Sequence, residues 1–174
     1  MGIQFETDYN METLTAMAKG LRKTVRKKRS RRVHIFAAVV LILGLLTILA
    51  TTAGGEPFGA SGELTMLEMQ VVILVSLFED KLNAWFARKR LLPGTEHAVA
   101  TFEEDGYVSA TGVTESRFSY AQIVAVAETA RYFVFALSSH HTQAYDKRTI
   151  RGGSVEDFRA FIAEKTGKLV ENIK

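Results

Sequence analysis

Two adjacent histidines, His140 and His141, are the first residues whose types suggest chemistry, because neutral imidazoles commonly bind metals. On a strand, however, neighbouring side chains point to opposite faces, and no third ligand follows at a typical spacing. Motifs of the G-x-S-x-G, P-loop and H-E-x-x-H types are absent, and the chain has no cysteine. We therefore expect a non-enzymatic protein with no metal, no cofactor and no small-molecule substrate.

A second candidate site is a possible anion or partner contact formed by Lys147, Arg148 and Arg151. Gly152 and Gly153 follow them directly and could form a nest of backbone N–H groups at a helix start. The same glycine pair is also typical of a simple turn that leads into a helix cap. We expect the turn, and keep the anion contact as an alternative.

The third candidate is a polar pair, Glu68 and Gln70, inside an otherwise apolar stretch. An ionisable group at membrane depth is costly and is often functional. Glu68 lies about one turn inside Leu64, where its side chain could reach the outer headgroups. We expect this interfacial position, and the alternative is an oligomer contact or an ion site.

Two apolar stretches must position these residues. Val33 to Ala53 is about 20 residues long without Asp, Glu, Lys or Arg, which is the length that a membrane-spanning helix needs. The second stretch is shorter, and we expect one long helix from Leu64 to about Phe86, joined to the first by a turn at residues 54–62. A cleaved signal peptide is disfavoured, because both the apolar run and the residues before it are too long.

Basic residues flank both stretches, and positive flanks are retained on the cytoplasmic side. The prediction is a multi-pass protein of the inner membrane with both termini in the cytoplasm. Lipid headgroup binding is the minority alternative for these cations. The net charge of +3 arises at these flanks, so nucleic acid is not expected as a partner. The flanking residues are Arg26, Lys27, Lys28, Arg29, Arg31, Arg32, Arg88, Lys89 and Arg90.

The division predicted is residues 1–32 as a basic amphipathic helix, 33–94 as a transmembrane hairpin and 95–174 as a cytoplasmic domain. In the first part, Asp8 or Asn10 could cap a helix with apolar residues at three-to-four spacing from Met11. In the last part we predict six antiparallel strands and a helix that Ser154 caps and Gly167 ends. The predicted strands are 97–102, 107–111, 116–120, 122–129, 131–137 and 142–147. The fold class is thus a membrane protein of α+β type.

The chain resembles the YcxB-like family of bacterial membrane proteins. The resemblance rests on F-E-E-D-G at Phe102–Gly106, on SYAQIVAVAETARYFVFAL and on YDKRTIRGGSVEDFRAFIAEKTG, and it extends from Phe102 to Gly167 most clearly. It implies a small half barrel similar to a pleckstrin-homology (PH) domain, closed by its C-terminal helix. Asp146 stands where family members commonly carry proline.

Three functions remain open from the sequence. The first is a membrane-anchored regulatory or interaction protein that presents a PH-like domain to a protein partner or a lipid headgroup. The second is an accessory or immunity-type subunit of a membrane complex, packed through Ala37, Ala38 and Gly44. The third is a small ion-handling oligomer that uses Glu68. The expected partners are the lipid bilayer and a protein, either another chain or further copies of this one.

Overall fold

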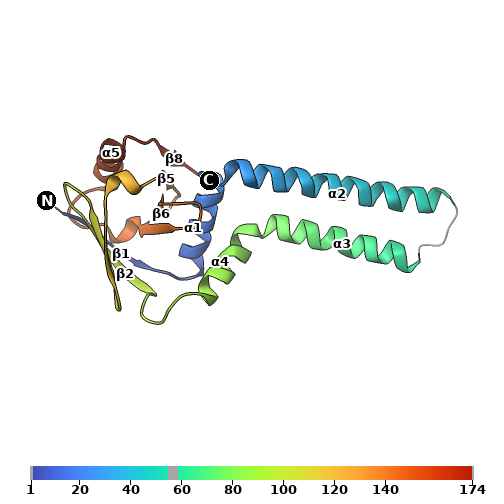
Figure 1. Ribbon diagram of the computed structural model, residues 1–174, viewed down its shortest axis with the longest axis horizontal. Helices are drawn as coiled ribbons and strands as arrows, with labels where there is room; N and C mark the ends of the chain where they lie inside the picture. Colours follow the sequence, from blue (N-terminus) through green and yellow to red (C-terminus); the bar gives the residue numbers. More distant parts are fainter. Residues whose placement is uncertain (1, 55–58, 174) are drawn as a thin grey trace. The chain divides into compact units, whose positions relative to one another are not determined.

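The computed structural model describes residues 2–54 and 59–173, and the chain divides into two compact units. One unit is a helical hairpin at residues 28–82. The other combines residues 1–27 with residues 83–174 and contains all the described strands. Figure 1 shows the order of the elements along the chain. Part of the turn predicted at residues 54–62 lies outside the described residues.

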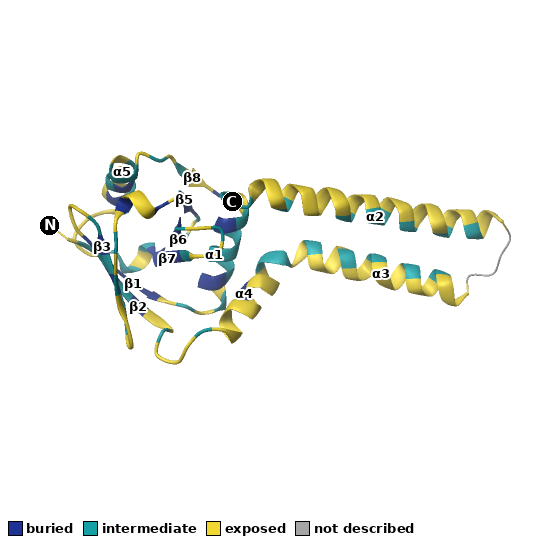
Figure 2. Ribbon diagram, viewed as in Figure 1, coloured by how far each residue is buried: buried dark blue, intermediate teal, exposed yellow. Residues whose placement is uncertain are grey.

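The hairpin consists of α2 (Lys27–Ala53) and α3 (Ala60–Leu77), both long and apolar enough to cross a membrane. Neither helix has a buried residue, because each touches only the other along one narrow face. On α3 the half-buried positions are Gly62, Thr65, Met69, Val72 and Ser76, and half-buried residues are drawn teal in Figure 2. Their alternating spacing of four and three residues is that of two helices packed side by side.

Gly44 is a point of close approach in the hairpin. A Cβ atom built there would lie 2.9 Å from the Met69 sulfur, closer than real atoms approach. Threonines of α2 donate their hydroxyls to backbone carbonyls one turn earlier, as Thr47 does to Leu43 at 2.9 Å. These polar groups are therefore satisfied inside the helix, as an apolar solvent would require.

The second arm differs from the prediction of one long helix from Leu64 to Phe86. Helix α3 begins four residues earlier than predicted, at Ala60, and ends at Leu77, and a separate helix α4 (Glu79–Lys89) follows. Phe78 has a ψ angle of 15°, outside the helical range. No proline causes this break. Glu79 and Asp80 lie in the first turn of α4, where acidic side chains stabilise a new helix N-terminus.

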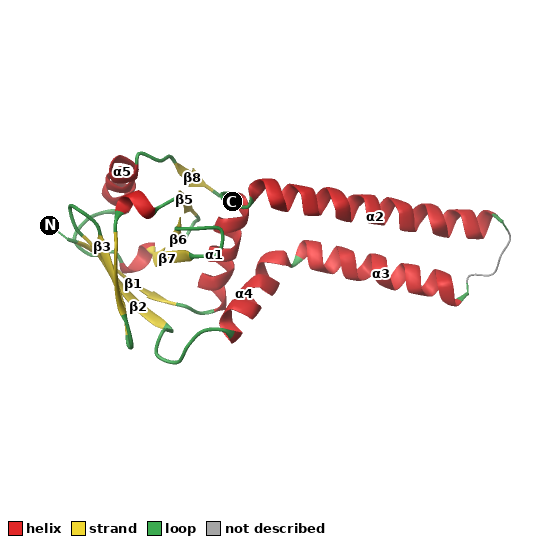
Figure 3. Cartoon of the chain, viewed as in Figure 1, coloured by secondary structure: helices red, strands yellow, loops and turns green. Residues whose placement is uncertain are grey.

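The strands form two four-stranded sheets, shown in Figure 3. The first has the order β1-β2-β3-β4 and is antiparallel throughout. The second has the order β7-β6-β5-β8, in which β8 runs parallel to β5 and the other pairs are antiparallel. The bounds are β1 (Ile3–Asp8), β2 (His97–Phe102), β3 (Tyr107–Thr111), β4 (Glu115–Phe118), β5 (Ala125–Glu128), β6 (Tyr132–Ala136), β7 (Thr142–Asp146) and β8 (Val170–Asn172).

All six predicted strands are confirmed, and those at residues 97–102 and 107–111 have the predicted ends. The strands β1 and β8 were not predicted. The prediction missed β1 because its partner strand lies on the far side of the hairpin in the sequence. A local signal was present, since Ile3, Phe5 and Thr7 alternate as a half-buried strand should. In the structure β1 pairs with β2 along its whole length, from Ile3 opposite Phe102 to Asp8 opposite His97. The helical hairpin is therefore an insertion between two paired strands.

The N-terminal helix also differs from its prediction. Helix α1 (Met11–Lys23), capped by Asn10 as expected, ends well before Arg32, and the basic run from Lys27 to Arg32 forms the first turns of α2. The apolar face of α1 packs against β5, β6 and β7, where Leu14 and Leu21 are buried, so this face is not available to lie on a lipid surface.

An aromatic core lies between the two sheets and helix α5 (Val155–Thr166). Phe5 and Phe158, both fully buried, meet edge to face with ring centroids 4.7 Å apart. Fully burying one such side chain contributes roughly 1.5–3 kcal/mol. Ser154 and Asp157 form the predicted capping box of α5, and Gly167 ends it in the left-handed conformation. The core thus joins β1, at one end of the chain, to α5 at the other.

Candidate functional site

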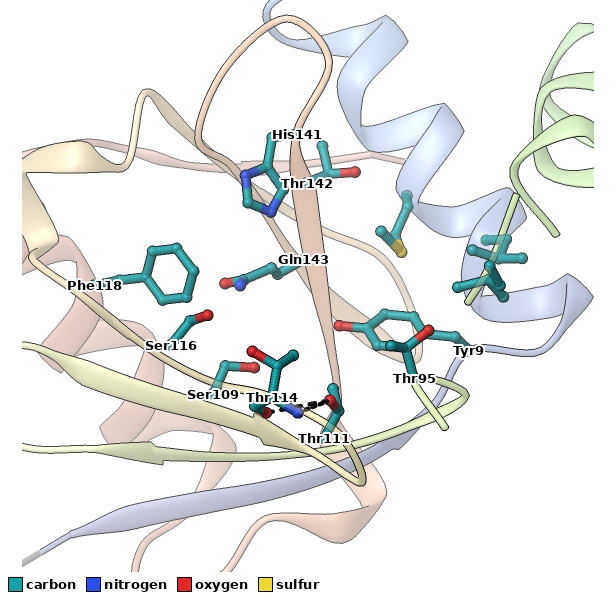
Figure 4. Close-up of a pocket in the computed structure, with 13 residues that line it drawn as sticks. Tyr9, Thr95, Ser109, Thr111, Thr114, Ser116, Phe118, His141, Thr142 and Gln143 are labelled. Carbon is teal, nitrogen blue, oxygen red and sulfur yellow. Dashed lines mark hydrogen bonds between the residues drawn. The ribbon is translucent and has the colours of Figure 1, made fainter. Parts of the chain in front are cut away.

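A pocket of about 280 Å³ opens at one end of the space between the two sheets. Along β3 the inward positions pass from Tyr107, in the aromatic core, to Ser109 and Thr111 in the pocket. This change from large to small side chains leaves the end of the barrel-like space unfilled. Figure 4 shows the lining residues, which come from β3, β4, β7, the start of α1 and the segment before β2. They are Tyr9, Leu14, Met17, Leu91, Thr95, Ser109, Thr111, Thr114, Ser116, Phe118, His141, Thr142 and Gln143.

Gln143 is the central polar group of this pocket. Its Oε1 atom accepts hydrogen bonds from the Tyr107 and Tyr145 hydroxyls, each at 2.7 Å. Burial raises the pKa of both tyrosines, so both stay protonated and act as donors. Two donors at one end of the amide require the oxygen there, which turns the Nε2 donor toward the pocket. Within residues 2–54 and 59–173, no group accepts a hydrogen bond from that nitrogen.

Tyr9 supplies a second donor, and burial raises its pKa to about 12. Its hydroxyl and the Gln143 amide point into the same space in Figure 4, opposite the Phe118 ring. None of the lining side chains is an Asp, Glu, Lys or Arg. The pocket is smaller than the roughly 300–1,000 Å³ usual for a cofactor. It can hold a group the size of one or two side chains, uncharged, with an acceptor atom for Gln143.

The two adjacent histidines have different surroundings. His141 lines the pocket, with its ring 6.2 Å from Phe118, while Nδ1 of His140 is 2.7 Å from the Ser139 hydroxyl. In the described part of the chain, no three His, Asp or Glu side chains lie together as metal ligands.

The three cations proposed for an anion are each paired with a carboxylate. Lys147 is 2.9 Å from Glu128, Arg148 is 2.9 Å from Asp146, and Arg151 is 3.1 Å from Glu6. Gly152 has a φ of +85°, which glycine alone adopts readily. At the start of α5, the backbone N–H of Ser154 donates to the Asp157 carboxylate instead of to an external anion. Asp146, at the position where proline is common in the resembling family, holds both Arg131 and Arg148 with its carboxylate.

The predicted basic flanks have several local roles. Arg26 donates from Nε to the Ser139 carbonyl at 2.6 Å, which ties the segment after α1 to the β6–β7 loop. Residues 27–29, 31 and 32 are exposed on the first turns of α2, and Arg90 is exposed just after α4. Lys89 lies over the Trp85 ring at 3.6 Å, and Arg88 lines a hollow with the paired side chains of Asp8 and His97.

The polar pair of the second arm lies on exposed positions of α3. Glu68 is the ninth of its 18 residues, and both Glu68 and Gln70 point away from the face that packs on α2. Glu68 therefore belongs to the hairpin unit, whereas the pocket and the paired cations belong to the unit that contains the sheets.

The pocket was not predicted, because it depends on which strands face one another. A signal was nevertheless present, since Tyr107, Ser109 and Thr111 alternate along one strand, and Ser116 and Phe118 along the next. Hydroxyls at inward positions, where β5 carries Val126 and β6 carries Phe133 and Phe135, indicate a part of the core that is not filled.

Comparison with known proteins identifies part of this unit. Residues 102–162 match the family model described as YcxB-like protein, in agreement with the resemblance noted in the sequence. No curated protein and no solved structure matches the chain.

Proposed function

We propose that this chain, whose residues 102–162 are a YcxB-like domain, is a non-enzymatic interaction protein anchored in the bacterial inner membrane. The two-helix hairpin is the anchor, and the unit that contains the two sheets binds a protein partner in the cytoplasm. The pocket at the end of the sheets, together with the adjoining strand β4, receives that partner.

The pairing of β1 with β2 carries the proposal. One strand precedes the hairpin and the other follows it, yet the two pair over six residues. A folded unit built from both flanks requires both ends of the hairpin to be on the same side of a membrane. Two helices of sufficient length and hydropathy lie between them, so an even number of crossings agrees with this requirement. The basic residues near both ends favour the cytoplasmic side.

The order of the elements supports a PH-like architecture. Four antiparallel strands form one sheet, three more antiparallel strands form most of the second, and a helix follows them and packs on the core. We infer that β8 and the inserted hairpin are additions to this plan.

A protein partner fits the site better than a lipid headgroup. A phosphorylated headgroup would need unpaired cations, whereas the pocket lining is uncharged and Lys147, Arg148 and Arg151 are paired. Strand β4 is hydrogen-bonded only to β3 among the described strands, so its outer edge can accept an extended segment. Ser116 and Phe118 of the same strand line the pocket, which would take one side chain of that segment.

The test compares two substitutions on neighbouring residues of β4. Ser116→Phe fills the pocket, while Arg117→Phe places the same ring on the exposed position beside it. After cross-linking in cells and quantitative mass spectrometry, we expect recovery of a specific protein to fall at least tenfold for Ser116→Phe, the loss expected when an anchor worth about 1.4 kcal/mol is excluded. Arg117→Phe should retain it. Equal recovery of the same proteins by both variants would contradict the proposal.

The topology is tested with reporter fusions. A phosphatase that is active only outside the cytoplasm should be inactive after Lys174 and active when inserted between Gly54 and Gly59. Activity at Lys174 would overturn the proposed orientation.

A further inference from the structure

We propose that the exposed face of α3 that carries Glu68 packs inside the membrane against the same face of a second copy of this chain, with the two Glu68 side chains in contact. This inference rests on the membrane insertion proposed above, but it assigns a role to a face that the anchor itself does not use.

The depth of Glu68 is the first step. At 1.5 Å per residue, α3 is about 27 Å long, and Glu68 is roughly 12 Å from Ala60 and 13 Å from Leu77. The contact of Gly44 with Thr65 and Met69 gives an independent position. Gly44 is close to the middle of the apolar run Val33–Ala53, and Glu68 lies between its two contacts in sequence. Both positions place Glu68 near the bilayer centre.

This depth differs from the interfacial position that we expected for Glu68 from the sequence. The interfacial position assumed a helix that starts at Leu64, whereas α3 starts one turn earlier at Ala60. Even the longer Lys and Arg side chains reach the interface only from near helix ends. A carboxyl at mid-depth therefore needs a hydrogen-bonding partner at the same depth, because leaving a polar group unpaired in hydrocarbon is costly.

Among the described residues of the hairpin, none is such a partner. The half-buried residues of α3 face α2, whereas Glu68 is exposed and makes no ion pair or hydrogen bond with any residue in 2–54 or 59–173. Its neighbours on the same side of the helix are Leu64, Val71 and Val75, all more than half exposed. Leu64, Glu68, Val71 and Val75 repeat at spacings of four, three and four, which is the pattern of a second helix-packing seam. We name these four residues the Glu68 seam.

A second copy is the partner that this seam fits. Copies inserted with the same topology carry Glu68 at the same depth, so a two-fold axis along the membrane normal brings the two carboxyls together. A carboxylic acid can both donate and accept, and the pair can therefore satisfy itself. A single polar position within an apolar seam also sets one register, as buried polar residues do in coiled coils.

The absence of cysteine from the chain permits a clean cross-linking test. Single variants of the full chain, Leu64→Cys, Val71→Cys and Val75→Cys, place a thiol on the Glu68 seam. Met66→Cys and Ile73→Cys place it on the opposite side of α3, where both residues are also exposed. In native membranes treated with copper phenanthroline, we expect disulfide-linked dimers at the three seam positions and at least fivefold less at the two controls. Equal cross-linking on both sides would overturn the proposed seam.

The same variants separate this inference from the anchor. A membrane-impermeant maleimide should not label Val71→Cys in intact vesicles. Labelling would contradict membrane insertion and thus the proposed function. Protection from labelling without seam cross-links would contradict only the association of two copies.

The role of the carboxyl is tested by measuring dimer dissociation by fluorescence energy transfer during lipid dilution. Glu68→Leu keeps the size of the side chain and removes its hydrogen bonds, so the dissociation constant should rise by roughly 3- to 30-fold, the range for one interhelical hydrogen bond. Glu68→Gln can still donate and accept and should stay close to the wild type. An unchanged constant for Glu68→Leu would show that Glu68 does not hold the copies together.

Discussion

At the scale of single residues, two buried polar groups organise the unit that contains the two sheets. Glu128, only 5% exposed, is 2.9 Å from Lys147 and forms two hydrogen bonds with Arg159, at 2.7 and 2.8 Å. It joins β5 to the segment after β7 and to α5. Gln143 joins two tyrosines of the core to the pocket. Both residues satisfy their partners, and removing either leaves charges or hydroxyls without one.

Glu128 gives a prediction for pH. Its hydrogen bond with Arg159, followed by that with Lys147, lowers its pKa. A carboxyl whose pKa is lower in the folded state contributes stability above its unfolded pKa of about 4.3, and the contribution is lost as pH falls through the folded pKa. We expect melting temperatures to fall between about pH 5 and 3, and to fall less in Glu128→Gln. Hydrogen bonds from Ser154 also lower the pKa of Asp157. Asp157→Asn should therefore remove a further part of the fall in melting temperature with decreasing pH. Identical slopes in the wild type and Glu128→Gln would exclude this role.

Gln143 gives a prediction for stability. Gln143→Leu removes the acceptor that Tyr107 and Tyr145 share, and we expect a loss of about 1–3 kcal/mol for a buried hydroxyl left without a partner. The same substitution should cost clearly less in a Tyr107→Phe/Tyr145→Phe background, where no hydroxyl remains to be orphaned. Chemical unfolding of the four variants measures this difference. An equal loss in both backgrounds would assign the effect to packing alone.

At the scale of elements, the packing of α1 on the second sheet buries a complete strand. It covers one face of β6, so that all five residues of that strand are buried. The close approach depends on Gly20, where a Cβ atom would lie 2.7 Å from Cγ1 of Val134. Arg26 follows the end of α1 and holds the β6–β7 loop. Thus the segment that leads into the hairpin is packed on the second sheet.

Gly20→Ala tests this packing. Alanine normally stabilises a helix interior by roughly 0.5–1 kcal/mol relative to glycine. Here we expect a net loss of about 1–3 kcal/mol, because the methyl group meets a stiff β-branched side chain. In a Val134→Ala background the same change should be neutral or stabilising. Thermal unfolding of the single and double variants gives the comparison, and a stabilising effect of Gly20→Ala alone would show that α1 can move away at no cost.

At the scale of the whole molecule, the hairpin is an insertion in a folded unit that is built from both flanks. Residues 1–27 and 83–174 form one compact unit although 55 residues separate them in the chain. The folding of this unit therefore requires both flanks to meet, and under the proposed membrane insertion they meet on one side of the membrane. Under the proposed function, any partner bound at the pocket would be connected to the anchor through two points of the chain.

Excision of the hairpin tests this organisation. Replacing residues 28–82 by a flexible linker of about ten Gly and Ser residues, which spans roughly 17 Å on average, should give a soluble monomer with native melting behaviour. A control that removes residues 9–96 and joins β1 to β2 by a tight turn also loses α1, which exposes Tyr132 and Val134, and should aggregate. Size-exclusion chromatography and circular dichroism distinguish these outcomes. A soluble, folded control would mean that α1 is dispensable.

The sequence by itself determined the elements that depend on local patterns. The two apolar runs, six of the eight described strands, the Asn10 cap and the Ser154–Asp157 capping box follow from composition, alternation and spacing, each over about 20 residues or fewer. The resemblance of residues 102–162 to a known family was also contained there.

Only the tertiary structure decided which of these elements meet. Phe5 belongs to the core because β1 pairs with β2 across the whole hairpin, a contact that no local pattern encodes. The pocket exists because β3, β4 and β7 bring small inward residues to one end of the two sheets. The approach of Met69 to Gly44 was also decided there, because it depends on how α2 and α3 pack on each other. For the aromatic core the deciding free energy comes from burial between segments that are distant in sequence.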